Sequence, residues 1–396
     1  MKLLSVDDAR AAMLAEAVVL PSETVPLASA IGRVLAEDIA AVRHQPPFAA
    51  SAMDGWAMRA ADTPGRLRIV GESAAGNAYA GAVAAGEAVR IFTGAAVPAG
   101  CDTVVIQEDA TREGDEVAVP QASTGQNIRG AGKDFAAGEA LLKAGDRIDP
   151  WRLSLAAAAG RAEVLVARRP RVALFSTGEE IVEAPAVPGP FQIYDSGSQA
   201  LAAMVTGWGG EAVRTRPVRD DLDATIEALR VAGGDLVVTV GGASVGDHDL
   251  VRAAGAALGL SLRVESVAVR PGKPTFFGVL SDGRRMLGLP GNPASAMVCA
   301  ELFLRPLIAA SLGAPSGLPM IQAQLAAPLP ANGPREHWMR AKLSFEGGVV
   351  TARPYRDQDS SLVSVFAVSD ALLRRGAGVP PSGAGDVVDV LPLARA

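Results

Sequence analysis

Four segments between residues 235 and 293 carry residue types that bind phosphate and metal ions. The apolar run Leu236–Val240 opens into Gly-Gly-Ala-Ser-Val-Gly-Asp-His-Asp (241–249), and Arg-Pro-Gly-Lys-Pro (270–274) and Gly-Leu-Pro-Gly-Asn-Pro (288–293) follow. A buried strand that ends in glycines offers backbone N–H groups to an anion. Cations and carboxylates accompany these glycines, so we expect a phosphorylated ligand held near a metal.

Three carboxylates, Glu180, Asp220 and Asp249, each follow a different expected strand and could converge. Asp249 closes a loop rich in N–H donors, where a further negative charge would repel phosphate unless a divalent cation lay between them. Oxygen ligands of this kind suit Mg²⁺, which commonly takes one or two carboxylates plus ligand phosphates. For Asp220-Asp221, capping of the helix that follows is the alternative.

The segment Ser176-Thr177-Gly178-Glu179-Glu180 supports two interpretations. Its hydroxyl and N–H groups could donate to phosphate while a carboxylate holds a cation. The same composition also fits a helix N-cap with acidic residues in the first turn. The segment alone leaves both open.

The two later motifs add cations and a helix start. Arg270 and Lys273 lie in a loop stiffened by two prolines, which limits their freedom before binding. The prolines and glycines of 288–293 precede an apolar run, which predicts a helix N-terminus that an oxyanion can reach. A Walker A sequence does not occur, and Gly130-Ala-Gly132 lacks the third glycine and the preceding strand of a dinucleotide motif.

The elements that must position these residues alternate in type from residue 171 on. Strands alternating with helices predict a mostly parallel sheet with its site at the carboxyl ends of the strands. The expected strands are 172–175, 212–217, 236–240, 263–269, 275–279 and 286–289, and the expected helices are 199–207, 222–232, 250–258 and 294–310.

The rest of the chain predicts three further parts. Helices are expected at 5–19, where Ser5 and Asp8 form a capping-box pattern, and at 27–35. Short alternating runs joined by turns predict strands at 67–70, 89–92, 103–106 and 116–119, and further strands at 322–326, 338–345, 348–354 and 386–391. The predicted domains are 1–44 plus 137–169 (helical), 45–136 (an inserted β-rich domain), 170–312 (α/β) and 313–396 (β).

Composition narrows the class of protein. The 396 residues, 49% hydrophobic and 20% charged, fit a folded chain of several domains, and the net charge of −6 argues against a nucleic-acid partner. Cys101 and Cys299 lack metal-ligand spacing and are expected to be reduced thiols. No signal peptide is evident, and charges at Glu301 and Arg305 argue against a membrane span at 294–312. We expect a cytoplasmic protein without a membrane partner.

The β-rich domain has polar pairs in its loops: Asp54-Gly55, Thr93-Gly94 and Lys133-Asp134. Asp54-Gly55 by itself predicts a hairpin turn, and composition gives none of the three a function.

The chain resembles the molybdopterin molybdenumtransferase (MoeA) family, which includes the E domain of gephyrin and its plant counterpart. Ordered motifs carry the resemblance: SAMDGWA (51–57), IFTG (91–94) through Gln107-Glu108, NIRGAGKD (127–134), STGEE (176–180), IYDS (193–196), and the glycine-rich, RPGKP and GLPGNP segments. It implies an elongated four-domain homodimer with a MogA-like α/β domain, an N-terminal helical domain, an inserted β-rich domain and a C-terminal β-barrel-like domain.

The resemblance also implies a reaction. The family takes adenylylated molybdopterin and molybdate, cleaves the adenylate in a Mg²⁺-dependent step, and releases molybdenum cofactor and AMP. A molybdopterin adenylyltransferase is the implied supplying partner. Little covalent chemistry is required of the protein, because a metal ion and cations stabilise charge on phosphoryl oxygens.

Residue roles follow by motif. Glu180, Asp220 and Asp249 would be the metal carboxylates, and Asp54, Thr93 and Asp134 would complete the catalytic site from the partner subunit. Arg340 and Ser360 are carried over from the C-terminal domain, where the motifs match loosely. The positions implied to bind substrate are Ser176, Thr177, Gly178, Asp195, Ser196, Gly241, Gly242, Ser244, Arg270, Lys273, Pro290, Gly291, Asn292, Pro293, Ser295, Arg340 and Ser360.

The chain departs from the family pattern at two positions. Ser266 stands where many members have Lys or Arg, and Gly197 stands where Asn is usual; both changes remove contacts expected near the ligand. They keep two alternatives open: a gephyrin-like dimeric scaffold, and a paralogue that binds molybdopterin without inserting metal. Three carboxylates at strand ends favour the transferase.

Overall fold

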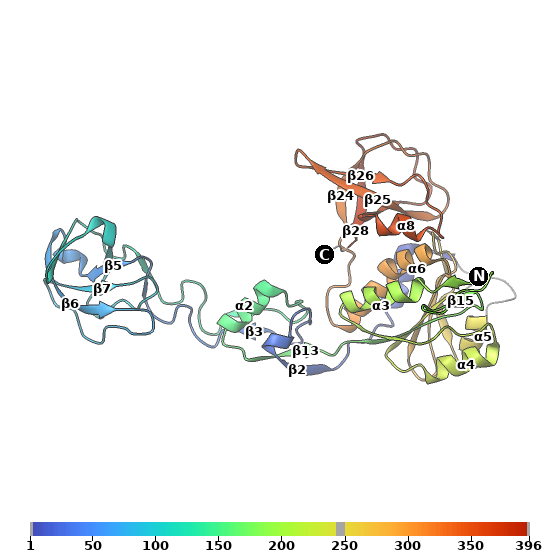
Figure 1. Cartoon of the computed structure of the whole chain (residues 1–396), viewed down its shortest axis with the longest axis horizontal. Coiled ribbons are helices and arrows are strands. Elements are labelled where there is room, and N and C mark those ends of the chain that lie inside the picture. The colour runs from blue at the N-terminus through green and yellow to red at the C-terminus, as the bar shows by residue number, and fades with distance from the viewer. Residues whose placement is uncertain (1–2, 243–249, 394–396) are drawn as a thin grey trace. The chain divides into compact units, whose positions relative to one another are not determined.

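The protein divides into two compact units, described here from a computed structural model that covers residues 3–242 and 250–393 (Figure 1). The first unit comprises Met1–Glu23, Gly32–Ala36 and Val166–Ala396, and the second comprises Thr24–Ile31 and Glu37–Leu165. The finer four-domain division stays a prediction.

A six-stranded mixed sheet forms the centre of the first unit, in the order β17-β14-β18-β23-β22-β19. The four strands from β17 to β23 are parallel, whereas β22 and β19 join antiparallel. All five residues of β18 are buried, as expected for a parallel strand covered on both faces. The predicted mostly parallel sheet is confirmed. The strands are β14 (Arg171–Ser176), β17 (Glu211–Arg214), β18 (Leu236–Val240), β19 (Ser261–Val264), β22 (Phe276–Val279) and β23 (Arg285–Leu289).

Helices cover both faces of this sheet. Alternate residues of β18 contribute to two separate cores: Val238 packs with the α3 residue Leu201, and Val237 packs with Leu229 of α4 and Val251 of α5. This is the period of two that side chains follow along a strand. The helical segments are α1 (Val6–Leu14), α3 (Gly197–Gly207), α4 (Leu222–Val231), α5 (Leu250–Ala257), α6 (Pro293–Cys299), the π-helical η4 (Ala300–Leu304) and α7 (Arg305–Ser311).

The helix α1 begins as predicted but packs elsewhere. The Ser5 hydroxyl accepts a hydrogen bond from the Asp8 N–H at 3.0 Å, which confirms the cap. Its buried residues Val6, Ala9 and Met13 join the core of the first unit, which includes Ala167 but is built mostly from residues outside the segment 137–169. An amphipathic helix is stabilised by burying its apolar face, and the core of the first unit covers that face of α1.

Several predicted elements are wrong. The expected helix at 27–35 is only a 3-10 turn (Leu27–Ser29), because Gly32 takes a positive φ of 74° and the chain leaves the helix there. The predicted N-terminal helical domain contains strands as well as helix: the short strands β2, β3, β12 and β13 accompany the helix α2 (Pro150–Ala158). The expected strand 263–269 is broken into three pieces. The elements concerned are β1 (Leu3–Leu4), β2 (Ser22–Pro26), β3 (Ile39–Ala40), β12 (Ala140–Leu142), β13 (Glu163–Ala167), β19, β20 (Ser266–Val267) and β21 (Val269–Arg270).

A closed β-barrel ends the first unit. Five strands follow one another as β25-β26-β24-β28-β27, and β27 pairs back onto β25. Ala341, Leu373 and Val390 are fully buried inside it. The predicted C-terminal barrel-like domain is confirmed. Its elements are β24 (Ile321–Leu325), β25 (Glu336–Glu346), β26 (Val349–Pro354), α8 (Val363–Ala367), β27 (Ala371–Arg375) and β28 (Val387–Pro392), with two further short strands of the unit, β15 (Ile181–Val182) and β16 (Ile193–Tyr194), lying before α3 in the chain.

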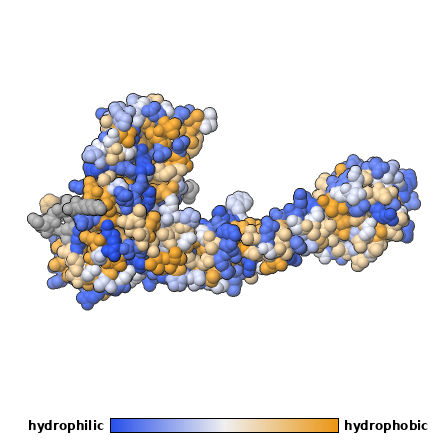
Figure 2. All heavy atoms as spheres, turned by 180° about the vertical axis from the view of Figure 1, so that it is seen from behind, coloured by the Kyte–Doolittle hydropathy of each residue, from blue (hydrophilic) through white to orange (hydrophobic). Residues whose placement is uncertain are grey.

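The second unit is built mainly of strands, as predicted. Its six-stranded sheet has the order β8-β5-β7-β6-β10-β9 around a core that includes Trp56, Leu67 and Val117. Figure 2 shows hydrophilic and hydrophobic side chains interspersed over the visible face of each unit. The strands are β4 (Ala50–Ser51), β5 (Gly55–Met58), β6 (Gly65–Ser73), β7 (Glu87–Ile91), β8 (Thr103–Ile106), β9 (Thr111–Glu113), β10 (Glu116–Val119) and β11 (Ile128–Arg129), with 3-10 turns η2 (Ala60–Asp62) and η3 (Gln107–Asp109).

One helix of the described residues, Pro293–Ser311, is long and apolar enough to cross a membrane by composition alone. Within its most apolar window, 78% is buried inside the protein. That burial accounts for its hydrophobicity as a core helix.

Candidate active site

A polar cleft of the first unit, about 950 Å³, lies at the carboxyl ends of the parallel strands. It begins where β14, β18 and β23 end, the position predicted for ligand binding in such a sheet. A segment before α8 closes one side. The cleft is lined by Ser176, Thr177, Gly178, Glu180, Ile181, Ile193, Tyr194, Asp195, Ser196, Gly197, Asp220, Val240, Gly241, Gly242, Leu250, Pro274, Pro290, Gly291, Asn292, Pro293, Ser361 and Val363.

Glycines form the floor of the cleft because side chains would not fit. Gly241 and Gly242 have φ values of 93° and 61°, and a Cβ on Gly241 would lie 2.8 Å from the Thr177 carbonyl oxygen. Gly291 lies against this turn: a Cβ there would be in ordinary van der Waals contact, 3.4 Å from the Gly241 Cα. The Gly241 N–H is used by the Leu289 carbonyl at 3.2 Å. No described residue accepts a hydrogen bond from the N–H of Gly242 or Gly291.

The Thr177 hydroxyl is a buried donor without a partner among the described residues. It lines the cleft beside the glycine floor. A buried polar atom of this kind costs free energy unless water or a ligand satisfies it. Thr177 is therefore placed to donate to a ligand oxygen.

The segment 176–180 is a turn leading into β15, and no helix follows it. The helix-cap interpretation of this segment is wrong. Gly178 has a φ of 139°, and the Glu180 carboxylate folds over it so closely that a Cβ would meet it at 2.5 Å. The glycine thus lets the exposed Glu180 lie against the turn.

A hydrogen-bonded network beneath the cleft holds Asp195. The buried carboxylate accepts hydrogen bonds from the Ser176 hydroxyl at 3.1 Å, and from the Ser198 N–H at 2.9 Å and hydroxyl at 2.5 Å. Arg214 donates to the Ser198 hydroxyl at 3.1 Å and pairs with Glu183. Both oxygens of Asp195 are committed to protein donors, so this residue orients its neighbours in the wall of the cleft.

Two of the three predicted metal carboxylates line the cleft. Glu180 and Asp220 are exposed, and the side chain of neither accepts a hydrogen bond or forms an ion pair with the described residues. Asp221 instead caps α4, because its carboxylate accepts the Ala224 N–H at 2.8 Å. Asp249 and the predicted substrate contact Ser244 lie outside the described residues. Among the residues described, no three His, Cys, Asp or Glu side chains gather into a metal site.

The predicted cations do not line the cleft. Arg270 and Lys273 are exposed, while Pro274 of the same loop reaches the cleft wall. His337 is buried and lies opposite Arg270 in the register of the neighbouring strands β25 and β21. Burial and the adjacent arginines Arg270, Arg340 and Arg335 lower the pKa of His337 to about 4.

The helix start at 293 is less open than predicted. Pro290 through Pro293 line the cleft, but the Ala294 N–H donates to the Ser360 carbonyl at 3.1 Å. The Asn292 side chain donates to the Ser360 hydroxyl at 2.8 Å. Ser295 is buried and does not line the cleft. One backbone N–H of this helix end is thus already used by the segment around Ser360, and the oxyanion site stays a prediction.

Arg340 is buried and holds the segment 358–362 by hydrogen bonds. Its guanidinium donates to the carbonyls of Asp359 at 2.9 Å and Leu362 at 3.0 Å, and to Gln358. These bonds hold the chain that places Ser361 and Val363 in the cleft wall. In this arrangement Arg340 acts on the cleft through its neighbours and does not line it.

Sequence reasoning missed apolar and hydroxyl groups of the wall: Ile181, Ile193, Tyr194, Ser361 and Val363. Tyr194 was within a motif, and Ser361 follows a serine assigned as a contact. The two positions that depart from the family pattern differ in their place relative to the cleft. Gly197 lines the cleft, whereas Ser266 is buried in β20 and does not.

In the second unit, the structure joins Asp54 and Thr93. The Asp54 carboxylate accepts hydrogen bonds from the Thr93 N–H at 2.7 Å and hydroxyl at 2.8 Å, which lower its pKa. Gly55 belongs to β5, where a Cβ would lie 2.0 Å from the Val105 carbonyl oxygen, so the hairpin-turn interpretation is wrong. Asp134 lines a cavity of about 650 Å³ whose basic members are Arg43, Arg129 and Lys133.

The fold and the cleft define a multidomain α/β protein with a polar ligand site at the carboxyl ends of parallel strands. Residues 4–160 match the MoeA N-terminal region (domain I and II), 173–310 a probable molybdopterin binding domain, and 322–393 the MoeA C-terminal region (domain IV). The chain belongs to the molybdopterin molybdenumtransferase (MoeA) family, as the motifs had indicated.

Individual relatives agree over most of the chain. A protein of Mycobacterium tuberculosis named molybdopterin molybdenumtransferase 2 is 39% identical, covering 83% of this chain and 84% of its own. One of Staphylococcus aureus named molybdopterin molybdenumtransferase is 31% identical, covering 94% and 91%. The crystal structure of the molybdopterin biosynthesis MoeA protein from Pyrococcus horikosii superimposes with a TM-score of 0.84 at 32% identity, covering 99% of each chain.

Proposed function

We propose that the chain is a molybdopterin molybdenumtransferase of molybdenum cofactor biosynthesis. Its substrates are adenylylated molybdopterin and molybdate, and its products are molybdenum cofactor and AMP. The observation that carries the proposal is the pair of uncommitted carboxylates, Glu180 and Asp220, in one cleft with the unpartnered Thr177 hydroxyl. The scaffold and binding-only alternatives are not favoured, because the relatives described above are transferases by name.

The donor set of the cleft fits a magnesium ion beside phosphate. Glu180 and Asp220 would hold Mg²⁺, which prefers one or two carboxylates and leaves positions for phosphate oxygens. When bound, Mg²⁺ neutralises charge that develops on the phosphoryl oxygens. The third carboxylate of the proposal is Asp249.

The chain's own groups orient the substrate. The Thr177 hydroxyl and the N–H groups of Gly242 and Gly291 would donate to phosphate oxygens, because they donate to no described residue. Asp195 keeps the Ser176 hydroxyl fixed beside them. Arg270 and Lys273, exposed on the loop that ends at Pro274, would attract the molybdate dianion.

The proposal includes a partner subunit and a location. A cytoplasmic homodimer would bring Asp54, Thr93 and Asp134 of one subunit to the cleft of the other, and a molybdopterin adenylyltransferase would supply the substrate. The family resemblance supports this arrangement.

The test is release of AMP by the purified full-length chain given adenylylated molybdopterin, molybdate and Mg²⁺. We expect AMP by chromatography, and none after EDTA. Glu180→Gln and Asp220→Asn should each lower the rate by at least about 100-fold, the size of effect found for removed electrostatic stabilisers. Glu179→Gln is the matched control, because Glu179 is an exposed neighbour that does not line the cleft. Binding of the substrate without AMP release would contradict the proposal.

A further inference from the structure

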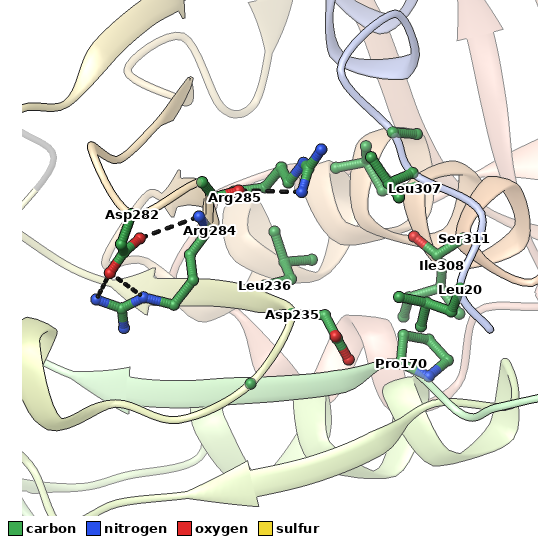
Figure 3. Close-up of a pocket in the computed structure, with 14 residues that line it drawn as sticks. Leu20, Pro170, Asp235, Leu236, Asp282, Arg284, Arg285, Leu307, Ile308 and Ser311 are labelled. Carbon is green, nitrogen blue, oxygen red and sulfur yellow. Dashed lines mark hydrogen bonds and ion pairs between the residues drawn. The ribbon is translucent and has the colours of Figure 1, made fainter.

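A second cavity of the first unit lies at the opposite end of the same strands (Figure 3). It measures about 340 Å³ and is lined by residues at the starts of β18 and β23 and just before β14. The residues that line it and those that line the active-site cleft do not overlap. Neither the motifs nor the proposed reaction uses it.

The body of this cavity is apolar. Leu236 lies at its centre, and Leu20, Leu307, Ile308 and Pro170 surround the space beside it (Figure 3). A volume of this size, with apolar walls and a few polar atoms, is typical of a site for a small organic molecule.

Three charged side chains around the cavity are already paired. The two oxygens of Asp235 accept hydrogen bonds from Arg168 at 2.7 and 3.1 Å, and one also accepts the Arg171 N–H at 2.8 Å. Asp282 pairs with Arg284 at 2.7 Å, and Arg284 also donates to backbone carbonyls at the end of α4. These groups neither attract nor repel an ion strongly.

Arg285 differs from them. Its Nε donates to the Glu16 carbonyl at 2.8 Å and its Nη1 donates to the Gly283 carbonyl at 3.0 Å, so backbone oxygens fix its position. Among the described residues, no carboxylate pairs with Arg285 and nothing accepts from its Nη2. Its charge is therefore oriented but not neutralised.

The Ser311 hydroxyl is a second uncommitted donor. It points into the cavity in Figure 3 and makes no hydrogen bond with a described residue. The two uncommitted side-chain groups of this cavity are thus a guanidinium N–H, which can only donate, and a hydroxyl, which can donate. A ligand that satisfies them needs an acceptor, and the unneutralised guanidinium favours an anionic one.

We propose that this cavity binds a small amphipathic monoanion, an aromatic or branched apolar body with one carboxylate. The body fills the space around Leu236 and Leu307, and the carboxylate accepts hydrogen bonds from Arg285 and Ser311. The proposal does not depend on the transferase activity.

Calorimetric titration with 2-naphthoate tests the proposal, with the neutral amide 2-naphthamide as the matched ligand. The wild-type chain should bind naphthoate more tightly than the amide. Arg285→Gln should weaken naphthoate binding by about 10-fold, which corresponds to loss of one charge-assisted hydrogen bond, and should weaken amide binding by much less, because the amide carbonyl accepts only a neutral-acceptor hydrogen bond from this position. Ala17→Trp, which places a ring in the cavity, should abolish binding of both. Arg230→Gln, an exposed arginine of α4, should change neither.

Two outcomes of the titrations would overturn the proposal. Failure of the wild-type chain to bind naphthoate would overturn the proposal. Naphthoate binding that survives both Arg285→Gln and Ala17→Trp would place the probe elsewhere and overturn it too. If Arg285→Gln does not fold, as judged by circular dichroism, Ser311→Ala provides the second polar variant and should weaken naphthoate binding selectively.

Discussion

At the scale of single residues, Asp54 owes its low pKa mainly to one neighbour, Thr93. The Thr93 N–H contributes most to lowering it, and the Thr93 hydroxyl contributes next. Thr93→Val removes the hydroxyl but keeps the N–H, so the pKa of Asp54 should rise part of the way toward 3.8. Carboxyl ¹³C shifts followed by NMR over a pH titration measure this. Thr111→Val, in the exposed β9, should leave the Asp54 titration unchanged; an equal shift in both variants would contradict the assignment.

His337 makes a prediction about stability. Its pKa is about 4 in the folded chain and near 6.5 when unfolded, so the fold stabilises the neutral imidazole. The unfolded chain then binds more protons between these values, and the free energy of unfolding should fall as pH drops below about 6.5. From pH 7 to pH 5 the loss from this residue is about 2 kcal/mol.

Urea unfolding at the two pH values checks the His337 effect. His337→Gln removes the titrating group, so its loss of unfolding free energy from pH 7 to pH 5 should be smaller than that of the wild type by about the same amount. Equal losses in the two proteins would show that His337 is free to protonate in the fold.

The residue types in the sequence located the cleft more accurately than they identified the side chains that line it. Glycines at strand ends indicated the cleft floor, because a positive φ and a close backbone approach both favour glycine there. Ser295 and Arg340 were assigned as ligand contacts but are buried. Arg340 is held by the carbonyls of Asp359 and Leu362, and the spacing of these residues in the sequence does not predict those hydrogen bonds. Whether the other assigned residues bind substrate stays a prediction.

At the scale of elements, buried strands were the easiest to predict. The bounds of β18 and β8 agree with the sequence prediction to the residue, since apolar runs bounded by turn residues have little freedom. The failures are at glycines and short pieces. Gly32 ends a pattern with helical spacing, and the run 263–269 divides because its parts pair with three different partners: β19 with β22, β20 with β1, and β21 with β25.

The turn after β18 has a conformation that only glycine adopts easily, so substituting Gly241 should disturb the cleft floor. Gly241→Ala introduces a Cβ at a φ of 93° and 2.8 Å from the Thr177 carbonyl oxygen, so the turn must shift at the cleft floor. AMP release should fall at least about 10-fold, in addition to the roughly 1–2 kcal/mol cost of a left-handed alanine. Gly283→Ala is the matched control, since its φ is 86° but nothing lies within 4 Å of the added Cβ.

Thermal unfolding and AMP release of the two glycine variants separate the effects. Gly283→Ala should lose stability and keep its rate. If both variants lose activity equally, backbone strain and not the cleft floor explains the Gly241 effect.

At the scale of the whole molecule, the chain order hides which parts pack together. Residues 3–23 contribute α1 to the core of the α/β unit although about 140 residues of the second unit separate them from it in the chain. An amphipathic pattern identifies an apolar face but not the surface that covers it. For the same reason no sequence motif marks the Arg285 cavity: its walls come from the segment after α1 and from the ends of β18, β23 and α7.

The shared active site of the proposed homodimer leads to a complementation experiment. Asp54→Asn alters the second unit and Glu180→Gln alters the first, so each variant alone should release no AMP. In a mixed dimer of the two chains, a site built from both subunits would be intact on one side and doubly altered on the other. Random assembly gives half mixed dimers, so co-expression should recover about a quarter of the wild-type rate. If each chain built its own complete site, every site would keep one alteration and the mixture would stay inactive. Size-exclusion chromatography with light scattering should show that both variants and the mixture remain dimeric, since loss of the dimer would itself abolish a shared site.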